Sequence, residues 1–373
     1  MSTALDIDAL LATAKIIVCC GSGGVGKTTT AAALAVRAAE QGRRTAVLTI
    51  DPARRLAQSL GLEELDNTPR RLPEVEGELD AMMLDMKRTF DEIVLTHATP
   101  AKAETILANP FYQALSSSFA GTQEYMAMEK LGQLRASGQW DLIVVDTPPT
   151  RSALDFLDAP HRLTTFLDGR LIRIMLAPSK AGGRAYLKVV TAGLGVFTGV
   201  ITRVVGKGVL QDVSALVAAL ETMFGGFRER ALATYALLKT PGTCFVVVAT
   251  PERDALREAA YFVERLAAEE MPLAGLVVNR VHPSPLPRLS AERALSLAED
   301  LDAHPLAAGV LRLHADGMRV ADREQRLQAR FTAAHPGVPV VCLAAQSEDV
   351  HDLPGLRAVG AELASAGEVG APA

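Results

Sequence analysis

Seven short apolar runs recur along the chain, and within each the apolar residues are consecutive rather than alternating with polar ones. Helices cover both faces of a parallel sheet, so its strands are apolar on both sides, and unbroken runs are typical of them. Helical patterns lie between several of the runs, as at 28–40, 251–269 and 353–364. This alternation predicts an α/β fold with a doubly wound, mostly parallel sheet. The expected strands are residues 15–20, 45–50, 79–84, 142–145, 243–249, 273–278 and 338–343.

Two long stretches interrupt this alternation, residues 86–137 and about 152–239. They contain helical patterns with Gly and Pro interruptions and no convincing strand. We expect them to form a helical subdomain inserted into a single domain that covers residues 1–364. The small and polar residues at 365–373 predict a disordered tail.

Composition and charge narrow the class of protein. The chain has 373 residues, 49% of them hydrophobic, and a formal net charge of −5, which argues against a nucleic-acid partner. Its first residues are acidic and lack the apolar core of a signal peptide, so we expect a cytoplasmic protein, peripheral at a membrane at most. Four cysteines without Cys-x-x-Cys spacing predict buried, reduced thiols. They are Cys19, Cys20, Cys244 and Cys342.

A glycine-rich segment follows the first expected strand and leads into an alanine-rich helix. Its letters GSGGVGKT match G-x-x-x-x-G-K-[ST] in the strand–loop–helix context that phosphate binding requires. Glycines let backbone N–H groups turn toward phosphate oxygens, and the helix N-terminus adds its positive dipole end. We expect Lys27 to reach the β- and γ-phosphates and the Thr28 hydroxyl to bind Mg²⁺. The predicted nucleotide-binding residues of this loop are Gly21, Ser22, Gly23, Gly24, Val25, Gly26, Lys27, Thr28 and Thr29.

Two aspartates stand at the ends of expected strands, Asp51 and Asp146. Ligands of open α/β sheets lie beyond the carboxyl ends of the strands, so both carboxylates should face the phosphates. Asp146 fits the residue that holds Mg²⁺, and Asp51 could orient or deprotonate the attacking water. Either could instead cap a helix N-terminus. Together with the loop they predict an ATP and Mg²⁺ site, with Lys27 and Asp51 as catalytic residues and Thr28, Asp51 and Asp146 as metal ligands.

Three segments together resemble the ArsA-type ATPases, which include arsenite-pump ATPases and targeting ATPases for tail-anchored membrane proteins. They are GSGGVGKTTT, TIDPARRLAQSLG and VVDTPPTRSALDFL, in the family's order and approximate spacing, and the resemblance covers about residues 15–360. It implies an ATP-hydrolysing P-loop protein of the deviant Walker A class that closes as a dimer. It also implies that Asp51 acts on the water in switch I and that Asp146 and Thr147 begin switch II. Asn279 would read adenine, and the segment after Val340 would cover the other face of the base.

The chain departs from the family pattern at Ser22, where the family has a signature lysine that reaches the partner's phosphates. A cation supplied in trans is worth roughly 10³–10⁵ in rate for this chemistry. A homodimer would lack this cation at both sites. We therefore favour a heterodimer with a related ATPase subunit that keeps the lysine.

Both switch segments also depart from the family pattern. Arg54 and Arg55 replace a histidine and a small polar residue in switch I. Either guanidinium could stabilise transition-state charge, or both could be solvated. In switch II, Arg151, Ser152 and Ala153 replace Gly-His-Thr.

Metal-binding features of the family are missing as well. No Cys-x-x-Cys is present to bridge a dimer through zinc, and the helical stretches contain no cysteine. Soft metalloids need thiolate ligands, so arsenite transport is disfavoured.

The second helical stretch contains an uncharged run at residues 189–202 within a basic region. It is too short to span a bilayer, for which about twenty residues are needed. It could be an amphipathic helix packed on the core, or a surface for an apolar helical client or an anionic membrane. The basic residues are Arg162, Arg170, Arg173, Lys180, Arg184, Lys188, Arg203 and Lys207.

Three functions remain open from the sequence. The first is an ATPase whose dimer closure moves a helical client- or membrane-facing region. The second is a poorly hydrolysing nucleotide-binding subunit of a heteromeric complex, which Ser22 favours. The third is the energising subunit of an anion exporter.

Overall fold

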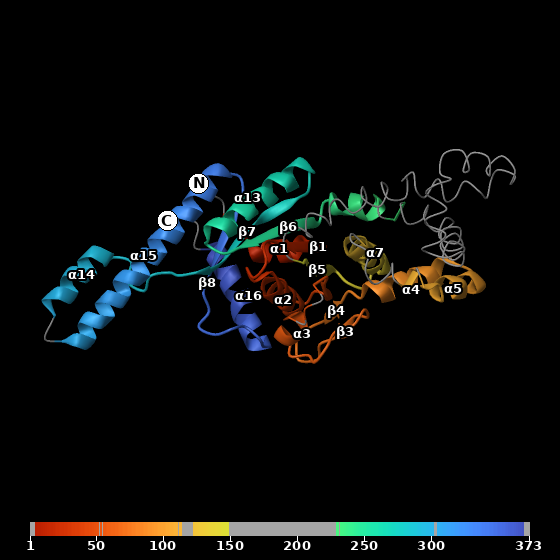
Figure 1. Cartoon of the computed structure of the whole chain (residues 1–373), viewed down its shortest axis with the longest axis horizontal. Helices are drawn as coiled ribbons and strands as arrows, with labels where there is room; N and C mark the ends of the chain where they lie inside the picture. The colour runs from red at the N-terminus through yellow and green to blue at the C-terminus, as the bar shows by residue number, and fades with distance from the viewer. Residues whose placement is uncertain are drawn as a thin grey trace, which may run out of the picture. The chain divides into compact units, whose positions relative to one another are not determined.

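The computed structural model describes residues 4–51, 53, 55–110, 112–113, 122–148, 229–230, 232–301 and 304–368. The chain divides into two compact units (Figure 1). The first unit comprises Met1–Met83, Gly138–Ala153 and Leu238–Ala373, and it contains the β-sheet. The second unit comprises Leu84–Ser137 and Leu154–Leu237, and its described elements are helices.

Eight strands of the described residues form one sheet in the order β3-β4-β2-β5-β1-β6-β7-β8. All neighbours are parallel except β3, which pairs antiparallel with β4. The predicted fold class, a doubly wound and mostly parallel sheet, is confirmed. The strands are β1 (Ile16–Cys20), β2 (Thr45–Thr49), β3 (Arg70–Arg71), β4 (Leu79–Met83), β5 (Leu142–Asp146), β6 (Thr243–Ala249), β7 (Leu273–Val281) and β8 (Val340–Ala344).

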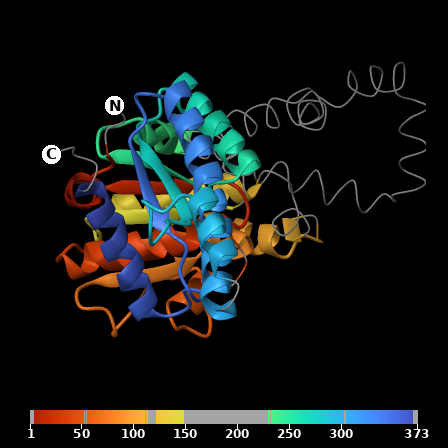
Figure 2. The same cartoon turned by 90° about the vertical axis from the view of Figure 1, so that its left-hand side faces the viewer.

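Helices cover both faces of this sheet. The crossover from β1 to β2 runs in one direction along the sheet and that from β6 to β7 in the other. Right-handed crossovers therefore place their helices, α2 (Lys27–Glu40) and α13 (Arg253–Ala268), on opposite faces (Figures 1 and 2). The other helices of this unit are α1 (Ile7–Thr13), α3 (Arg55–Ser59), α14 (Ala291–Asp300), α15 (Pro305–Ala334) and α16 (Leu353–Glu368).

The helix after the glycine-rich loop, α2, is packed closely because its side chains are small. Six of its alanines are buried, and α16 packs against it. A Cβ added at Gly360 of α16 would come within 3.3 Å of the carbonyl oxygen of Ala33, so glycine permits this approach. The close packing holds the N-terminus of α2 at the carboxyl end of β1, where the loop lies.

The structure corrects several details of the sequence prediction. Four elements were not predicted: α1, β3, α14 and α15. Helix α16 ends at Glu368, so the tail predicted as disordered from residue 365 begins inside a helix, and residues 369–373 lie outside the described residues. All four cysteines are free, but Cys244 and Cys342 are only partly buried. Burial raises the pKa of Cys20 to about 12, so its thiol stays protonated.

The described part of the second unit contains α4 (Met86–His97), α5 (Pro100–Leu107) and α7 (Thr122–Ser137). Helix α4 packs against both others. The predicted helical subdomain over 152–239 lies almost wholly outside the described residues, and so does the uncharged run at 189–202. In the ranges given above, we find no helix whose length and apolar character would allow it to cross a bilayer.

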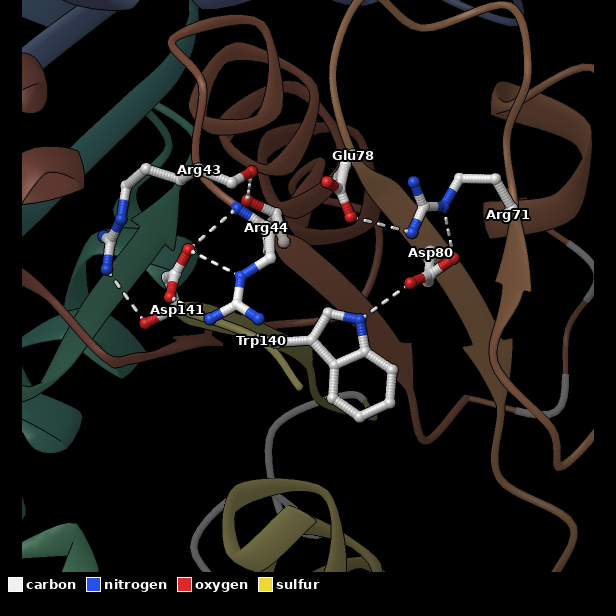
Figure 3. A network of polar contacts seen from close by, with 8 residues as sticks. Arg43, Arg44, Arg71, Glu78, Asp80, Trp140 and Asp141 are labelled. Atoms are coloured by element: carbon white, nitrogen blue, oxygen red, sulfur yellow. Dashed lines mark hydrogen bonds and ion pairs between the residues drawn. The ribbon is translucent and has the colours of Figure 1, made fainter. Parts of the chain in front are cut away.

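A buried carboxylate ties β4 to the segment that enters β5 (Figure 3). Asp80 accepts hydrogen bonds from Trp140 Nε1 and Arg71 Nε, both at 2.8 Å. Nearby, Arg44 pairs with Asp141, and Arg43 donates to the carbonyl of Asp141. The start of β5 is thus connected by side chains to both β2 and β4.

Loss of this carboxylate should destabilise the sheet. Asp80→Ala leaves the indole N–H of Trp140 buried and without its acceptor, which we expect to cost about 2–4 kcal/mol in the free energy of unfolding. Asp80→Asn keeps an acceptor and should cost less. Urea unfolding followed by the fluorescence of Trp140, the only tryptophan, measures both. Equal stability of Asp80→Ala and the wild type would contradict the assignment.

Candidate functional site

The glycine-rich loop connects β1 to α2 and depends on backbone conformations that favour glycine. Gly21, Gly24 and Gly26 have φ of 151°, 78° and 94°. A Cβ at Gly21 would lie 2.0 Å from the carbonyl oxygen of Val248, and one at Gly26 would lie 2.2 Å from Nδ2 of Asn279. The loop therefore packs against both β6 and β7, with no room for larger residues at these two positions.

Helix α2 begins at the end of this loop without a side-chain cap. Gly26 occupies the cap position and, having no side chain, makes no capping hydrogen bond to the first turn. Uncapped backbone N–H groups at a helix N-terminus bind anions. Lys27 lies in the same turn, and its Nζ donates to the carbonyl oxygen of Ser22 at 2.7 Å. Burial lowers the pKa of Lys27, while the Asp146 carboxylate opposes this shift.

Asp146, the last residue of β5, is fully buried and joined to the loop. Its Oδ2 accepts hydrogen bonds from Thr28 Oγ1 at 2.8 Å and from Thr49 Oγ1 at 2.9 Å. Its Oδ1 is buried without a hydrogen-bond partner in the described part of the chain. Burial raises the pKa of Asp146 from 3.8 to about 6, although the two hydroxyls and Lys27 oppose that shift. A buried carboxylate with an unpaired oxygen is the expected state of a cation ligand.

Asp51 lies two residues beyond the end of β2, on the wall of a cavity that Lys27 and Thr28 also line. Its Oδ1 accepts a hydrogen bond from the backbone N–H of Ala53 at 2.9 Å, and its own N–H donates to Thr49 Oγ1 at 3.2 Å. The carboxylate thus stabilises the turn before α3, as in the capping alternative. It also lines the cavity, so the turn places the carboxylate where the prediction requires it, beside the expected phosphates.

Asn279 lies in β7 and contacts the loop directly. Its Nδ2 donates to the carbonyl oxygen of Val25 at 2.8 Å, and its Oδ1 accepts from the backbone N–H of Arg280 at 2.9 Å. Arg280 has a φ of 61°, which is unusual for a residue other than glycine. The amide therefore connects the end of β7 to the glycine-rich loop, and its contact with adenine stays a prediction.

Lys27, Thr28, Asp51 and Asn279 line one cavity of about 650 Å³, within the size range of small-molecule sites. The buried Asp146 lies behind Thr28, to which it is hydrogen-bonded. The wall of the cavity is formed by the loop, Asp51, Arg55, Asn279 and the segment after β8. The sequence prediction had placed the segment after Val340 against the base, but it had not named several of the lining residues individually. All follow strand ends or lie on α3, where ligands of α/β sheets bind, but their residue types alone do not distinguish them. These residues are Gln58, Ser59, Gln346, Glu348, Asp349 and His351.

The donor set fits Mg²⁺ better than a softer metal. In the part of the chain that the structure describes, no group of three His, Cys, Asp or Glu residues could hold a metal ion. Mg²⁺ binds through one or two carboxylates together with water and substrate phosphates. The unpaired Oδ1 of Asp146 and the adjacent Thr28 hydroxyl suit that mode.

Some predicted features cannot be placed. The following lie outside the described residues: Arg54, Arg151, Ser152, Ala153 and the basic region within 161–207. Thr147 is described, and its Oγ1 donates to the carbonyl oxygen of Cys19 at 2.8 Å. This bond joins the start of the predicted switch II to β1.

Comparison with known proteins agrees with this geometry. The family model of anion-transporting ATPases, ArsA_ATPase, matches residues 14–293. ATPase ARSA2 of Chlamydomonas reinhardtii is 30% identical over 264 residues, which are 70% of this chain and 66% of that protein. ATPase GET3 of Podospora anserina is 27% identical over 263 residues, which cover 70% of this chain and 71% of that one. A putative arsenical pump-driving ATPase of Prosthecochloris vibrioformis is 29% identical over 151 residues, 40% and 36% of the two chains.

The match to ARSA2 spans just under two thirds of that protein's length. The family model, in contrast, covers well over half of this chain and includes the glycine-rich loop, Asp51, Asp146 and Asn279. The resemblance read from the three sequence segments is thereby confirmed. The chain belongs to the ArsA-type family of anion-transporting ATPases.

Proposed function

We propose that this protein binds ATP with Mg²⁺ in the 650 Å³ cavity and hydrolyses it. The observation that carries the proposal is the hydrogen bond from Thr28 Oγ1 to Asp146 Oδ2, beside the unpaired Oδ1 of the same carboxylate. The pair brings together the loop hydroxyl and the strand-end carboxylate that hold the magnesium of P-loop enzymes. Family membership supports the same chemistry.

Each residue has a distinct role in this proposal. The N–H groups of the loop and of the first turn of α2 bind the phosphates, and Lys27 leaves Ser22 to reach the β- and γ-phosphates. Thr28 and Asp146 hold Mg²⁺, which neutralises phosphate charge when it is bound. Asp51 orients the water that attacks the γ-phosphorus and accepts its proton. Asn279 and the segment after β8 enclose the base.

We further propose that the protein works as a dimer, preferably with a related ATPase subunit. Ser22 is half-buried, and its short hydroxyl cannot reach a partner's phosphates as a lysine would. A lysine from a related subunit would restore the missing cation at this site. The same feature supports the alternative that this chain mainly binds nucleotide and hydrolyses it poorly.

The second unit offers a place for an apolar client. A groove of about 580 Å³ lies between α4 and α5 and is lined mainly by apolar residues. Leu95 in its wall is 60% exposed. An apolar helix is the partner that this surface suits, and a cytoplasmic location with peripheral membrane contact would be consistent with it.

Removing the loop lysine should abolish tight nucleotide binding. Lys27→Ala deletes a buried ammonium beside the predicted phosphates, so we expect about 100-fold weaker binding of Mg-ATP. Isothermal titration calorimetry measures this affinity. Lys87→Ala, which removes an exposed lysine of α4 paired with Asp91, is the matched control and should bind as the wild type does. Equal affinity of the two variants would contradict the assigned phosphate site.

Asp146→Asn should separate stability from function. Asp146 binds a proton more readily in the folded state than in the unfolded chain, so folding stability falls as pH rises between about 4 and 6. At neutral pH the buried charge costs the nucleotide-free protein about 3 kcal/mol. Without nucleotide, we therefore expect Asp146→Asn to raise the melting temperature more at pH 8 than at pH 5.

Mg-ATP should stabilise the wild type more than Asp146→Asn, which is the opposite of the order expected without nucleotide. Mg-ATP should raise the melting temperature of the wild type and have little effect on Asp146→Asn, because the variant lacks the anionic metal ligand. Differential scanning calorimetry at both pH values, with and without Mg-ATP, measures these effects. An equal rise with Mg-ATP in both proteins would exclude Asp146 as a ligand.

Arg55 is the candidate for a cation that this chain itself supplies to the transition state, in place of the lysine that is missing at Ser22. It lines the cavity with Lys27 and Asp51, and its charge contributes to lowering the pKa of Lys27. Removing a transition-state arginine is costly in phosphoryl transfer, so we expect Arg55→Ala to lower kcat at least about tenfold with little change in ATP affinity. Ser22→Lys should raise kcat, and in the double variant Ser22→Lys/Arg55→Ala it should restore the kcat that Arg55→Ala loses.

Arg257→Ala, on the exposed surface of α13 and paired with Asp254, is the control for the loss of an arginine. Single-turnover hydrolysis and ATP affinity, measured on each variant, separate catalysis from binding. If Arg55→Ala and Arg257→Ala hydrolyse ATP equally fast, Arg55 is a solvated residue rather than a catalytic one.

A further inference from the structure

The turn that follows β8 contains a glutamine whose amide is held in one orientation. Gln346 lines the 650 Å³ cavity, and its Nε2 donates to the carbonyl oxygen of Ala344 at 3.1 Å and to Glu362 Oε2 at 2.9 Å. Both partners of this nitrogen are acceptors, so turning the amide over would place its oxygen against two other oxygens. The nitrogen of Gln346 therefore faces Glu362, and its carbonyl oxygen is turned away from that carboxylate.

The carbonyl oxygen of this amide is available to a ligand. Within the described part of the chain, Oε1 of Gln346 accepts no hydrogen bond, and the residue is exposed in the nucleotide-free protein. An amide oxygen has two acceptor positions and no proton to donate. Gln346 thus offers a ligand in the cavity an acceptor of fixed direction.

Glu362 connects this turn to the body of the fold. Its Oε1 accepts a hydrogen bond from the backbone N–H of Ala344 at 2.7 Å, while its Oε2 holds the amide of Gln346. Glu362 lies on α16, which packs against both β8 and α2 (Figure 1). The direction of the Gln346 amide is therefore set by a packed helix rather than by the exposed turn alone, which is the kind of support that a specific binding site needs.

The distance from the phosphate loop to Gln346 suits an elongated ligand. In the sheet, β8 is the third strand from β1, and neighbouring strands lie about 4.8 Å apart, so about 14 Å separates β1 from β8. The glycine-rich loop follows β1, whereas Gln346 follows β8. A nucleoside triphosphate whose phosphates bind the loop can therefore extend its base along the strand ends toward Gln346.

The amino group of adenine is the part of a base that this acceptor suits. Adenine has an N–H donor at position 6, where guanine has an oxygen acceptor. Asn279 is already engaged, because its Nδ2 donates to Val25 and its Oδ1 accepts from the backbone of Arg280. Glu348 and Asp349 also line the cavity, but no hydrogen bond within the described residues fixes either side chain. Gln346 is thus the acceptor in this turn that the fold orients in advance.

We propose that Gln346 is a specificity-determining residue that recognises the 6-amino group of adenine, and that Glu362 is the positioning residue that directs its carbonyl oxygen to the base. The proposal rests on the proposed function, ATP binding in this cavity, and adds the source of its preference for adenine. A base with an oxygen at position 6 sets two acceptors against each other, so such a base is rejected.

Isothermal titration calorimetry with three nucleotides, each with Mg²⁺, tests the role of Gln346. Purine riboside triphosphate has only hydrogen at position 6, and ITP has an oxygen there. We expect the wild type to bind ATP about tenfold more tightly than purine riboside triphosphate, and to bind ITP more weakly still. Gln346→Ala should bind ATP about tenfold more weakly and purine riboside triphosphate as the wild type does, so its preference for ATP disappears. Gln325→Ala, which removes an exposed glutamine of α15 outside the cavity, is the matched control and should keep the wild-type preference.

Glu362→Gln tests the positioning role without touching the base. A glutamine offers one acceptor and one donor where glutamate offers two acceptors, so it no longer fixes the orientation of the Gln346 amide. We expect the preference for ATP over ITP to fall at least about fivefold in this variant. A purely structural role of the two residues would instead weaken the binding of all three nucleotides equally and leave the preferences unchanged.

The two proposals fail in different ways. If the wild type binds Mg-ATP but binds purine riboside triphosphate equally well, or if Gln346→Ala keeps the wild-type preference, the assignment of Gln346 is wrong and ATP binding stands. If the wild type binds none of the three nucleotides, the proposed function fails and this assignment fails with it. The melting temperature of each variant, measured without nucleotide, verifies that it is folded.

Discussion

The site depends on one buried carboxylate that two different elements stabilise. Asp146 stands at the carboxyl end of a central strand, and hydroxyls from the start of α2 and the end of β2 both donate to the same oxygen. Such burial favours the protonated acid, and the remaining oxygen has no hydrogen-bond partner among the described residues. A cation at that oxygen would remove both costs. Without nucleotide, the buried Asp146 carboxylate lowers the stability of the fold, and bound Mg-ATP would offset this cost.

The surrounding architecture serves to hold the glycine-rich loop against three strands. Gly21 fits beneath the backbone of β6, and Gly26 fits against Asn279 of β7. Thr147 attaches the segment after β5 to β1. Thr28, next to the loop, is hydrogen-bonded to Asp146 of β5, and Asn279 of β7 is hydrogen-bonded to Val25 in the loop. A change in the position of the loop on nucleotide binding would therefore alter contacts at both strands. Coupling of that kind suits an ATPase in which the nucleotide state sets the state of the protein.

Much of this arrangement was predictable because parallel strands and phosphate loops have strong local patterns. All seven predicted strands exist: β6 has the predicted bounds, and the other six differ at one or both ends by one to three residues. Five of the nine predicted loop residues line the cavity. The two-residue strand Arg70–Arg71 has no apolar pattern and forms by pairing with β4. Helix α15 was missed because only four of its residues are buried, two of them alanines, while several of its leucines and valines face solvent. The hydrogen bond from Asn279 to Val25 joins residues 254 positions apart, which no local pattern reveals.

Binding of a divalent cation together with nucleotide tests the central claim most directly. Mn²⁺ can replace Mg²⁺, and pulsed electron paramagnetic resonance detects both its binding and its coupling to phosphorus. The account predicts that the wild-type protein holds a single Mn²⁺, coupled to ATP phosphorus, only when ATP is present, and that Asp146→Asn loses this complex. Retention of the same coupled signal in Asp146→Asn, or no bound Mn²⁺ in the wild type with ATP, would contradict it.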